Sequence, residues 1–156
     1  MTAEIDKTAR GARSSGPARV RIWRRIEWVD TDKSGYWHFA SAFRLFEAAE
    51  TTLWQHLGGK EQLGDIPRVH VTASFRKKVL YLDVVAVDLL VERIGRSSVS
   101  YSITISRDGE LCVEGEMVVA AVDPASGDTQ PIPDDIRRAL ESVGELTEDM
   151  PPGAGR

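Results

Sequence analysis

The chain has 156 residues, of which 42% are hydrophobic and 28% are charged, and its formal net charge is -4 at pH 7. This is the size and composition of one globular domain with one core, and the acidic balance argues against nucleic acid as the main partner. No run approaches the roughly 18 to 20 apolar residues that span a bilayer, and the N-terminal end lacks the apolar segment of a secretory signal, so we expect a cytoplasmic protein with no membrane partner.

Both ends of the chain predict flexible segments. Residues 1–18 form a basic leader, and residues 141–156 form an acidic tail that closes in Pro and Gly residues. Segments of this kind bury too little apolar surface to offset the entropy cost of ordering them. The sequence therefore predicts one domain over residues 19–140.

The first half of this domain predicts a strand, a tight turn and a helix. Residues 20–28 alternate imperfectly in a way that favours a strand, and Lys33-Ser34-Gly35 predicts a turn. From Phe39 to Leu57 the apolar residues recur with a helical period. Gly58-Gly59 predicts the C-terminal end of that helix.

The second half predicts antiparallel strands. Four strands are expected, the first of them half-buried, over residues 69–75, 83–93, 97–107 and 110–122. Asp108-Gly109 predicts a hairpin turn, and a short helix with an Asp as N-cap is expected over residues 134–140.

The order of these elements predicts the fold class. Because no βαβ repeat occurs, we expect an α+β domain with an antiparallel sheet of about five strands and one long helix. One helix leaves part of such a sheet uncovered at a face or an edge. The uncovered part favours self-association by pairing of sheets.

The most informative segment is Asp30-Thr31-Asp32-Lys33-Ser34-Gly35, which places carboxylates at a glycine turn directly before a helix. A calcium loop needs a bidentate Glu at its twelfth position, and this chain has Ser41 there and no helix before the loop. A phosphate-transferring aspartyl enzyme needs a buried parallel strand before its Asp-x-Asp, which the predicted order does not provide. A carboxylate and free backbone amides that act together on one carbonyl group fit the segment.

This segment is part of a longer resemblance. Residues 25–35, followed by Phe43 to Ala49, closely resemble the opening motif of the 4-hydroxybenzoyl-CoA thioesterase group of hotdog-fold proteins. The likeness covers residues 19–140 and continues through residues 75–79, Asp83, residues 95–99 and residues 122–124. It implies a hotdog fold, in which an antiparallel sheet wraps around one long central helix.

The resemblance also implies a reaction, the hydrolysis of an acyl thioester in a homodimer or homotetramer with sites at subunit interfaces. It places the catalytic carboxylate at Asp32 and the carbonyl-polarising backbone amide at Phe39. The free amides and the positive dipole end of a helix N-terminus stabilise negative charge that develops on a carbonyl oxygen. Asp32 either attacks the carbonyl to form an anhydride or acts as general base on a water, and the sequence leaves both open.

Nearby residues have two interpretations each. Asp30 is either a second functional carboxylate or a cap for the amides of the turn that follows it. His38 stands one residue before the position at which some relatives have a histidine, and it either turns toward Asp32 and takes part in catalysis or lies at the surface. Gly35 permits a close turn beside the ligand. Glu47 either hydrogen-bonds within the site or is a solvated or interface residue.

Substrate contacts are expected from aromatic and basic side chains. Trp37 and Phe43 suit an apolar or aromatic acyl group, although aromatic residues at helical spacing are more often part of the core. Arg76, Lys77 and Lys78 are candidates for the nucleotide phosphates of coenzyme A, although each alone is more often an exposed surface charge. We expect no metal and no cofactor, since coenzyme A is part of the substrate.

The sequence thus predicts an acyl thioester hydrolase that acts on an acyl-CoA or acyl-carrier-protein thioester. The alternative is a non-catalytic hotdog module that binds acyl-CoA or another protein, because a fold does not determine its function. The acyl group and its carrier are left open.

Overall fold

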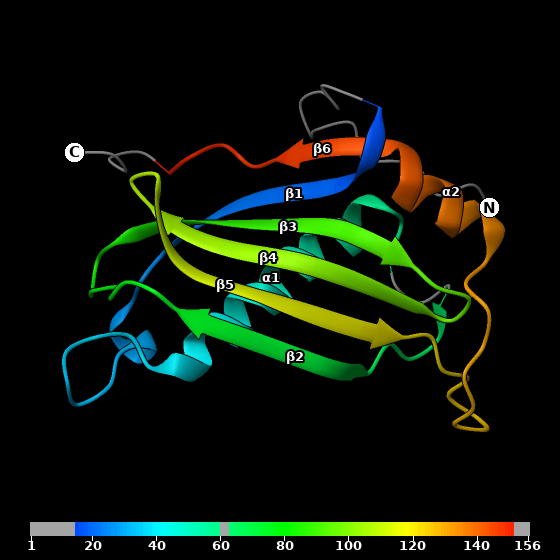
Figure 1. The fold of residues 1–156 in the computed structure, drawn as a ribbon, viewed down its shortest axis with the longest axis horizontal. Helices are drawn as coiled ribbons and strands as arrows, with labels where there is room; N and C mark the ends of the chain where they lie inside the picture. The colour runs from blue at the N-terminus through cyan, green and yellow to red at the C-terminus, as the bar shows by residue number, and fades with distance from the viewer. Residues whose placement is uncertain (1–14, 60–62, 152–156) are drawn as a thin grey trace.

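The structure, a computed structural model, describes residues 15–59 and 63–151. Its elements are, in chain order, β1 (Gly16–Arg25), the short 3-10 helix η1 (Trp28–Asp30), α1 (Phe39–His56), β2 (Arg68–Phe75), β3 (Val84–Ile94), β4 (Ser98–Arg107), β5 (Glu110–Ala120), α2 (Asp134–Ser142) and β6 (Val143–Thr147). The strands form one six-stranded sheet in the order β2-β5-β4-β3-β1-β6. Figure 1 shows α1 behind this sheet and α2 next to β6. The predicted α+β class is confirmed.

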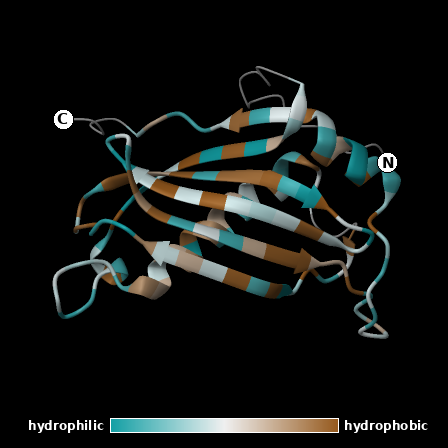
Figure 2. Cartoon of the chain, viewed as in Figure 1, coloured by the Kyte–Doolittle hydropathy of each residue, from teal (hydrophilic) through white to brown (hydrophobic). Residues whose placement is uncertain are grey.

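The sheet is antiparallel except at its sixth strand. β1 pairs with β3, β3 with β4, β4 with β5 and β5 with β2 in antiparallel register, whereas β6 joins β1 in parallel. The hairpin between β4 and β5 turns at Asp108 and Gly109, which both have positive φ, as the Asp-Gly pair predicts. Figure 2 shows alternating hydrophobic and hydrophilic bands along the strands, the pattern of a sheet with one buried face.

The first strand begins and ends earlier than predicted. β1 starts at Gly16, so residues 16–18 of the predicted flexible leader are part of the sheet, while residues 1–14 lie outside the described residues. The predicted strand over residues 20–28 stops at Arg25, and Trp28–Asp30 turns into η1. The physical reason is the carboxylate of Asp30, which accepts the main-chain N–H of Glu27 and closes the chain into a helical turn.

The prediction of a flexible tail over residues 141–156 is wrong for its first part. α2 continues to Ser142, and residues 143–147 form β6, in which Leu146 is buried opposite Val20 of β1. Beyond β6, Glu148 pairs with Arg24 at 2.9 Å. β6 holds too few apolar residues to predict a strand, because main-chain pairing with β1 defines it more than burial does.

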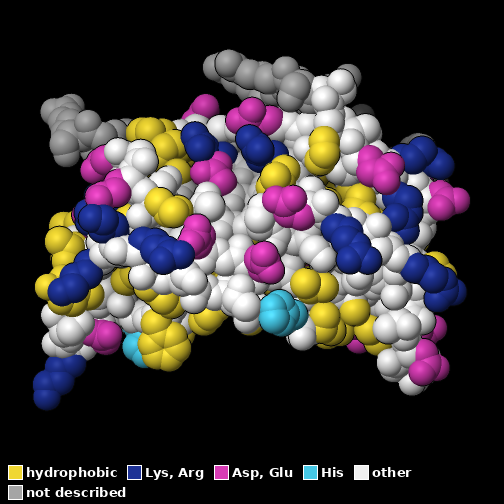
Figure 3. All heavy atoms as spheres, viewed as in Figure 1, with side chains coloured by type: hydrophobic (Ala, Val, Ile, Leu, Met, Phe, Trp, Pro, Cys, Tyr) yellow, Lys and Arg dark blue, Asp and Glu magenta, His cyan; other side chains and the backbone are white. Residues whose placement is uncertain are grey.

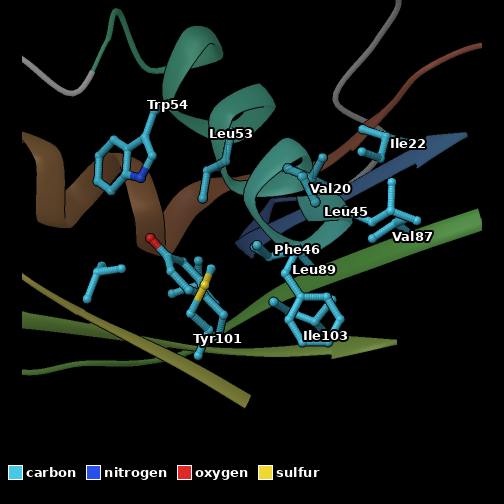
Figure 4. Close-up of a cluster of buried hydrophobic side chains, with 14 of the residues drawn as sticks. Val20, Ile22, Leu45, Phe46, Leu53, Trp54, Val87, Leu89, Tyr101 and Ile103 are labelled. Carbon is cyan, nitrogen blue, oxygen red and sulfur yellow. The ribbon is translucent and has the colours of Figure 1, made fainter. Parts of the chain in front are cut away.

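α1 follows the predicted helix closely. Its buried face repeats at helical spacing and includes Ala42, Leu45, Phe46, Ala49 and Leu53. Figure 4 shows Leu45, Phe46 and Leu53 pointing toward the sheet, where Leu89 and Ile103 meet them. Each fully buried Leu or Phe side chain contributes about 1.5 to 3 kcal/mol of transfer free energy. The helix ends where predicted, with Gly58 and Gly59 at φ values of 88° and 95°.

β2 is more exposed than predicted. Its register places Val71, Ala73 and Phe75 opposite Met117, Gly115 and Val113, which puts them on the sheet face that carries α1. Val71 is nevertheless 42% exposed and Phe75 45% exposed. α1 packs mainly against β1 and β3, so the inner face of this edge strand is covered only in part, at Ala73. The half-buried prediction is therefore wrong for the single chain.

Charge is distributed over the surface rather than concentrated. Figure 3 shows Lys and Arg side chains interspersed with Asp and Glu on the face toward the viewer. Cross-strand pairs contribute to this pattern, such as Arg21 with Asp88 at 2.7 Å. In the described ranges no helix combines the length and hydropathy that crossing a membrane requires. The cytoplasmic location stays a prediction.

Gly115 of β5 allows α1 to lie close to the sheet. A Cβ at this position would lie 2.1 Å from the main-chain oxygen of Thr72 and 2.9 Å from the ring of Phe46. Contacts this short with backbone cannot be relieved by rotating a side chain. Only a residue without a side chain fits between β2 and the Phe46 ring.

We therefore expect Gly115→Ala to lower the free energy of unfolding by about 1 to 3 kcal/mol through overpacking. Urea denaturation of the variant and of the parent protein measures the difference. Gly16→Ala is the matched control, because a Cβ at Gly16 meets nothing within 4 Å. Equal loss of stability in both variants would contradict the packing argument.

Candidate functional site

The segment between β1 and α1 is joined together by Asp30. This residue is only 6% exposed. Its Oδ2 accepts the main-chain N–H of Glu27 at 2.8 Å, and the guanidinium of Arg44 lies against its Oδ1. Its main-chain oxygen accepts the N–H of His38 at 2.6 Å and the hydroxyl of Ser41 at 3.0 Å. Asp30 thereby connects η1 to the first turn of α1.

Asp32 lies in a closed turn before α1. Its N–H donates to the main-chain oxygen of Tyr36 at 2.9 Å, and its own oxygen accepts the N–H of Gly35 at 3.0 Å. A bridge between Thr31 and Trp37 closes the base of the turn. Gly35 has a φ of 83°, and a Cβ there would meet nothing within 4 Å. The glycine is therefore required by backbone conformation, not by lack of space.

The carboxylate of Asp32 faces solvent and is held by Ser34. Its Oδ1 accepts the N–H of Ser34 at 2.7 Å and also the Ser34 hydroxyl. The hydroxyl first and the amide second lower the pKa of Asp32, a small desolvation opposes them, and the charge of His38 adds to the lowering. The group is therefore ionised at neutral pH, as a nucleophile or general base must be.

The first turn of α1 leaves the amide of Phe39 free. The N–H of Ala40 donates to Nδ1 of His38 at 3.1 Å, and the N–H of Ser41 donates to the main-chain oxygen of His38 at 2.8 Å. The N–H of Phe39 donates to no group within the described residues, and Phe39 is 61% exposed. A helix N-terminus places positive potential on such a donor. The amide that the resemblance singles out is thus unengaged, at the start of a helix whose first residue is exposed.

His38 is the N-cap of α1. Its ring stacks on that of Phe39, with ring centroids 4.5 Å apart. Because Nδ1 accepts the Ala40 amide, a neutral ring carries its proton on Nε2. The contacts of His38 serve the helix, and its participation in catalysis stays a prediction.

The two aromatic residues expected at the site belong largely to the core. Trp37 is 7% exposed, donates its main-chain N–H to the main-chain oxygen of Val79 at 3.1 Å, and meets the ring of Phe75 edge-on at a centroid distance of 6.5 Å. Phe43 is half-buried and meets the ring of Phe46 edge-on at 5.8 Å. Of the two, Phe43 leaves the larger surface for a ligand.

Glu47 is part of a cluster that joins α1 to β2. The guanidinium of Arg68 lies 2.6 Å from Oε2 of Glu50 and 3.6 Å from Oε1 of Glu47. Glu50 is buried and also accepts the hydroxyl of Tyr101 at 3.4 Å, and burial raises the pKa of Tyr101 well above its usual value. Glu47 itself is exposed and lies about two helical turns beyond Phe39. Its observed partner is the edge strand, not the Asp32 turn.

The three predicted phosphate-binding cations are exposed but not equivalent. Arg76 pairs with Glu114, and Lys77 pairs with Glu110 at 3.2 Å. Lys78 instead lies over the ring of Tyr36, with Nζ 4.1 Å from the ring centroid. Tyr36 belongs to the turn that holds Asp32, so Lys78 is the one of these three cations that contacts the turn.

Several residues of this site were missed or misread from the sequence. The predicted cap of the turn amides by Asp30 is wrong, because Asp30 caps the residue behind it, Glu27. Ser34 was missed as the donor to Asp32, although the Asp-x-Ser spacing is a known turn signal that could have found it. Ser41 and Arg44 were missed because nothing local marks a helix residue that bonds back to a preceding loop.

In the part of the chain that the structure describes, no group of possible metal ligands points to another site. Within residues 15–59 and 63–151, no three His, Cys, Asp or Glu side chains converge as metal ligands do. A surface pocket between β3 and α2 is lined by residues that include Arg93, Ile94 and Leu140. None of the predicted site residues lines it. The Asp32 turn and the start of α1 therefore remain the candidate site.

The chain is similar in sequence to one protein family. Residues 26–140 match the model of a family described as the Thioesterase-like superfamily. The match spans most of the chain and includes the turn, α1 and the four strands β2 to β5. No curated protein sequence matches the chain.

Solved structures with a similar fold have thioesterase names. A 1,4-dihydroxy-2-naphthoyl-CoA thioesterase from Synechocystis superposes with a TM-score of 0.72 at 17% identity, covering 78% of this chain and 95% of that one. A predicted thioesterase from Bacillus stearothermophilus gives 0.71 at 23% identity, covering 78% and 93%. The gentisyl-coenzyme A thioesterase BH1999 gives 0.70 at 19% identity, covering 77% and 98%. These likenesses establish the hotdog-type fold.

Removing the Ser34 hydroxyl tests the cause of the low Asp32 pKa. We expect Ser34→Ala to raise the pKa of Asp32 toward its usual value, because the largest stabilising donor is lost while the Ser34 amide remains. Carbon-13 NMR titration of the Asp32 carboxyl measures the change. A lowered pKa favours the folded state above the unfolded pKa, and this contribution is lost as pH falls through the folded pKa.

The matched control is Ser126→Ala. The Ser126 hydroxyl accepts the turn amide of Asp128 at 3.2 Å, as the Ser34 hydroxyl accepts that of Tyr36 at 3.3 Å. It should leave the Asp32 titration unchanged. An unaltered Asp32 pKa in Ser34→Ala would show that another interaction keeps the carboxyl ionised.

Proposed function

The chain belongs to the Thioesterase-like superfamily and is a thioester hydrolase, and we propose that Asp32 is its catalytic carboxylate and the Phe39 amide its oxyanion donor. The observation that carries this proposal is the pairing of an ionised, exposed carboxylate with a free helix N-terminal amide in one short segment. Nucleophilic or base chemistry and charge stabilisation are the two functions that acyl transfer requires.

The Phe39 amide would act on the thioester carbonyl. Negative charge develops on the carbonyl oxygen as the carbon becomes tetrahedral, and a free N–H at a helix N-terminus stabilises it. One such donor is worth about 3 to 4 kcal/mol in the transition state. The neighbouring Ala40 and Ser41 amides are already bonded, so Phe39 supplies the donor from this turn.

Asp32 would act in one of two ways. In the first, a carboxylate oxygen attacks the carbonyl carbon, the C–S bond breaks, the thiolate leaves and takes a proton, and water then hydrolyses the mixed anhydride. In the second, Asp32 takes a proton from a water that attacks the carbonyl directly. Both routes begin from the ionised carboxylate, which is the form of Asp32 at neutral pH.

The proposed substrate is an acyl-CoA thioester. Two neighbours in fold carry names with CoA thioesters of aromatic acids, 1,4-dihydroxy-2-naphthoyl-CoA and gentisyl-CoA, which supports this class. Lys78, which lies beside the turn on Tyr36, is a candidate for a phosphate contact. Arg76 and Lys77 would have to leave Glu114 and Glu110 to do the same. The acyl-carrier protein is the other possible carrier, and its thioesters are included in the substrate panel below.

We also propose that the enzyme is a homodimer that forms through β2. This strand has an unpaired outer edge and an exposed apolar inner face, with Val71 and Phe75 at 42% and 45% exposure. An exposed strand edge pairs readily with another strand, and a two-fold axis lets the same edge serve both copies. The inner face of β2 would then be covered by the second copy.

The catalytic proposal is tested with aliphatic and aromatic acyl-CoA and acyl-carrier-protein thioesters and detection of the free thiol. Asp32→Asn keeps the size of the side chain and removes its charge, and we expect kcat to fall by about 10²- to 10⁴-fold. Asp108→Asn is the control, because Asp108 is an exposed Asp in the β4–β5 turn. Full activity in Asp32→Asn would exclude the proposed role.

The dimer proposal is tested by light scattering coupled to size-exclusion chromatography. We expect the wild type to elute at twice the 17.2 kDa chain mass, and Val71→Lys to shift the mass toward one chain by placing a charge in the covered face. Val29→Lys is the control, because Val29 is a 73% exposed apolar residue outside β2. A wild type of single-chain mass at micromolar concentration contradicts the proposal.

A further inference from the structure

Asp30 is a buried carboxylate for which the proposed reaction has no use. In the described part of the chain, Asp30 and Glu50 are the two charged residues that are buried. Removing a carboxylate from water costs several kcal/mol unless ion pairs and hydrogen bonds replace its hydration. A neutral residue would fill the position without that cost, so the contacts of Asp30 require an explanation.

The contacts of Asp30 surround the proposed oxyanion donor. Its main-chain oxygen binds the N–H of His38, directly before Phe39, and the hydroxyl of Ser41, two residues after it. Its carboxylate faces Arg44, one turn further along α1. Phe39 therefore lies between residues that are both anchored to Asp30, although its own amide is left free.

The same residue also controls the Asp32 turn. Asp32 follows two residues later, and the Thr31–Trp37 bridge closes its turn against the segment that leads into α1. On the other side, the bond from the Glu27 amide to Oδ2 fixes Asp30 to η1 at 2.8 Å. A shift of Asp30 would therefore move the carboxylate of Asp32 relative to the Phe39 amide.

We propose that Asp30, held by Arg44, is a positioning residue that sets the separation between the Asp32 carboxylate and the Phe39 amide during thioester hydrolysis. This inference rests on the proposed function. Asp30 does not touch the substrate, because its carboxylate is buried, with Oδ2 bonded to the Glu27 amide and Oδ1 facing Arg44. Its effect passes through the geometry of two other groups, and geometry of this kind affects kcat more than substrate binding.

The test replaces Asp30 by Asn, which keeps the size of the side chain and an acceptor for Glu27 but turns an uncharged amide toward Arg44. A displacement of about 1 Å costs up to about 10²-fold, so we expect Asp30→Asn to lower kcat by about ten- to hundredfold and to leave KM within about twofold. The acid limb of the pH profile of kcat/KM should stay at its wild-type pH, because Asp32 still titrates there.

Asp83→Asn is the matched control. The carboxylate of Asp83 also accepts a main-chain N–H, that of Leu80 at 2.8 Å, and also pairs with an arginine, Arg107, at 2.7 Å. It lies outside the proposed machinery, so kcat should stay near the wild-type value. An equal fall of kcat in both variants would mean a general loss of stability and would overturn the inference.

A double-mutant cycle tests whether Arg44 acts through Asp30 or affects kcat independently of it. If Arg44 acts through Asp30, then Asp30→Asn combined with Arg44→Gln should be no slower than the slower single variant, because contacting residues in one network are not additive. Independent losses that multiply would overturn this part, as would an unchanged kcat in Asp30→Asn.

Amide hydrogen exchange measured by NMR tests the positioning role of Asp30 without relying on enzyme activity. We expect the His38 amide, which donates to Asp30, to exchange faster in Asp30→Asn than in Asp83→Asn. Absence of turnover in the wild type would overturn the proposed function alone. Equal His38 exchange in the two variants would overturn the positioning role, whatever the wild-type activity.

Discussion

The segment that carries the site depends on one carboxylate withdrawn from water. Between the end of β1 and the start of α1 the chain has only a short 3-10 helix and a turn, so its main-chain groups need partners from outside regular structure. Asp30 supplies two kinds of acceptor, its carboxylate for the Glu27 amide and its main-chain oxygen for His38 and Ser41. The carboxylate thus adds the bond to Glu27 and the ion pair with Arg44, while the two bonds to the first turn of α1 come from the main chain.

Two aspartates separated by one residue have opposite environments. Asp30 is buried against Arg44, whereas Asp32 is exposed and bonded only to Ser34 of its own turn. Burial makes Asp30 a rigid attachment point, and exposure makes Asp32 available to a ligand. The short Asp-Thr-Asp spacing thus places a fixed carboxylate next to an accessible one, because Asp30 ends η1 whereas Asp32 lies in the turn that follows.

Elements that are stabilised by burial were predicted accurately from the sequence, and elements that are stabilised by main-chain pairing were not. α1 and β4 were predicted closely because burial defines them, and burial leaves a periodic pattern in the sequence. β6 was not predicted, because it is a short edge strand that main-chain pairing with β1 defines. The exposure of β2 could not be predicted either. Its alternation is real, but the number of elements that cover a face is a property of the whole fold.

Within the candidate site, features with a local sequence signal could be predicted, and contacts between residues far apart in the sequence could not. The Asp32 turn could be predicted because its signals, an Asp and a Gly three residues apart, are local, and Ser34 falls within the same signal. The partners of Asp30 could not, because they lie at four positions on both sides of it with no fixed spacing. Hydrogen bonds between a loop and a helix side chain leave no periodic trace.

The position of the histidine decides how many donors the helix presents. An N-cap side chain reaches the amides of the second or third helical residue and cannot reach the first. His38 as N-cap therefore occupies the Ala40 amide and leaves that of Phe39 open. A histidine one residue later would stand inside the first turn and could not act as its cap. The position of His38 therefore determines that the Ala40 amide is engaged while the Phe39 amide is free.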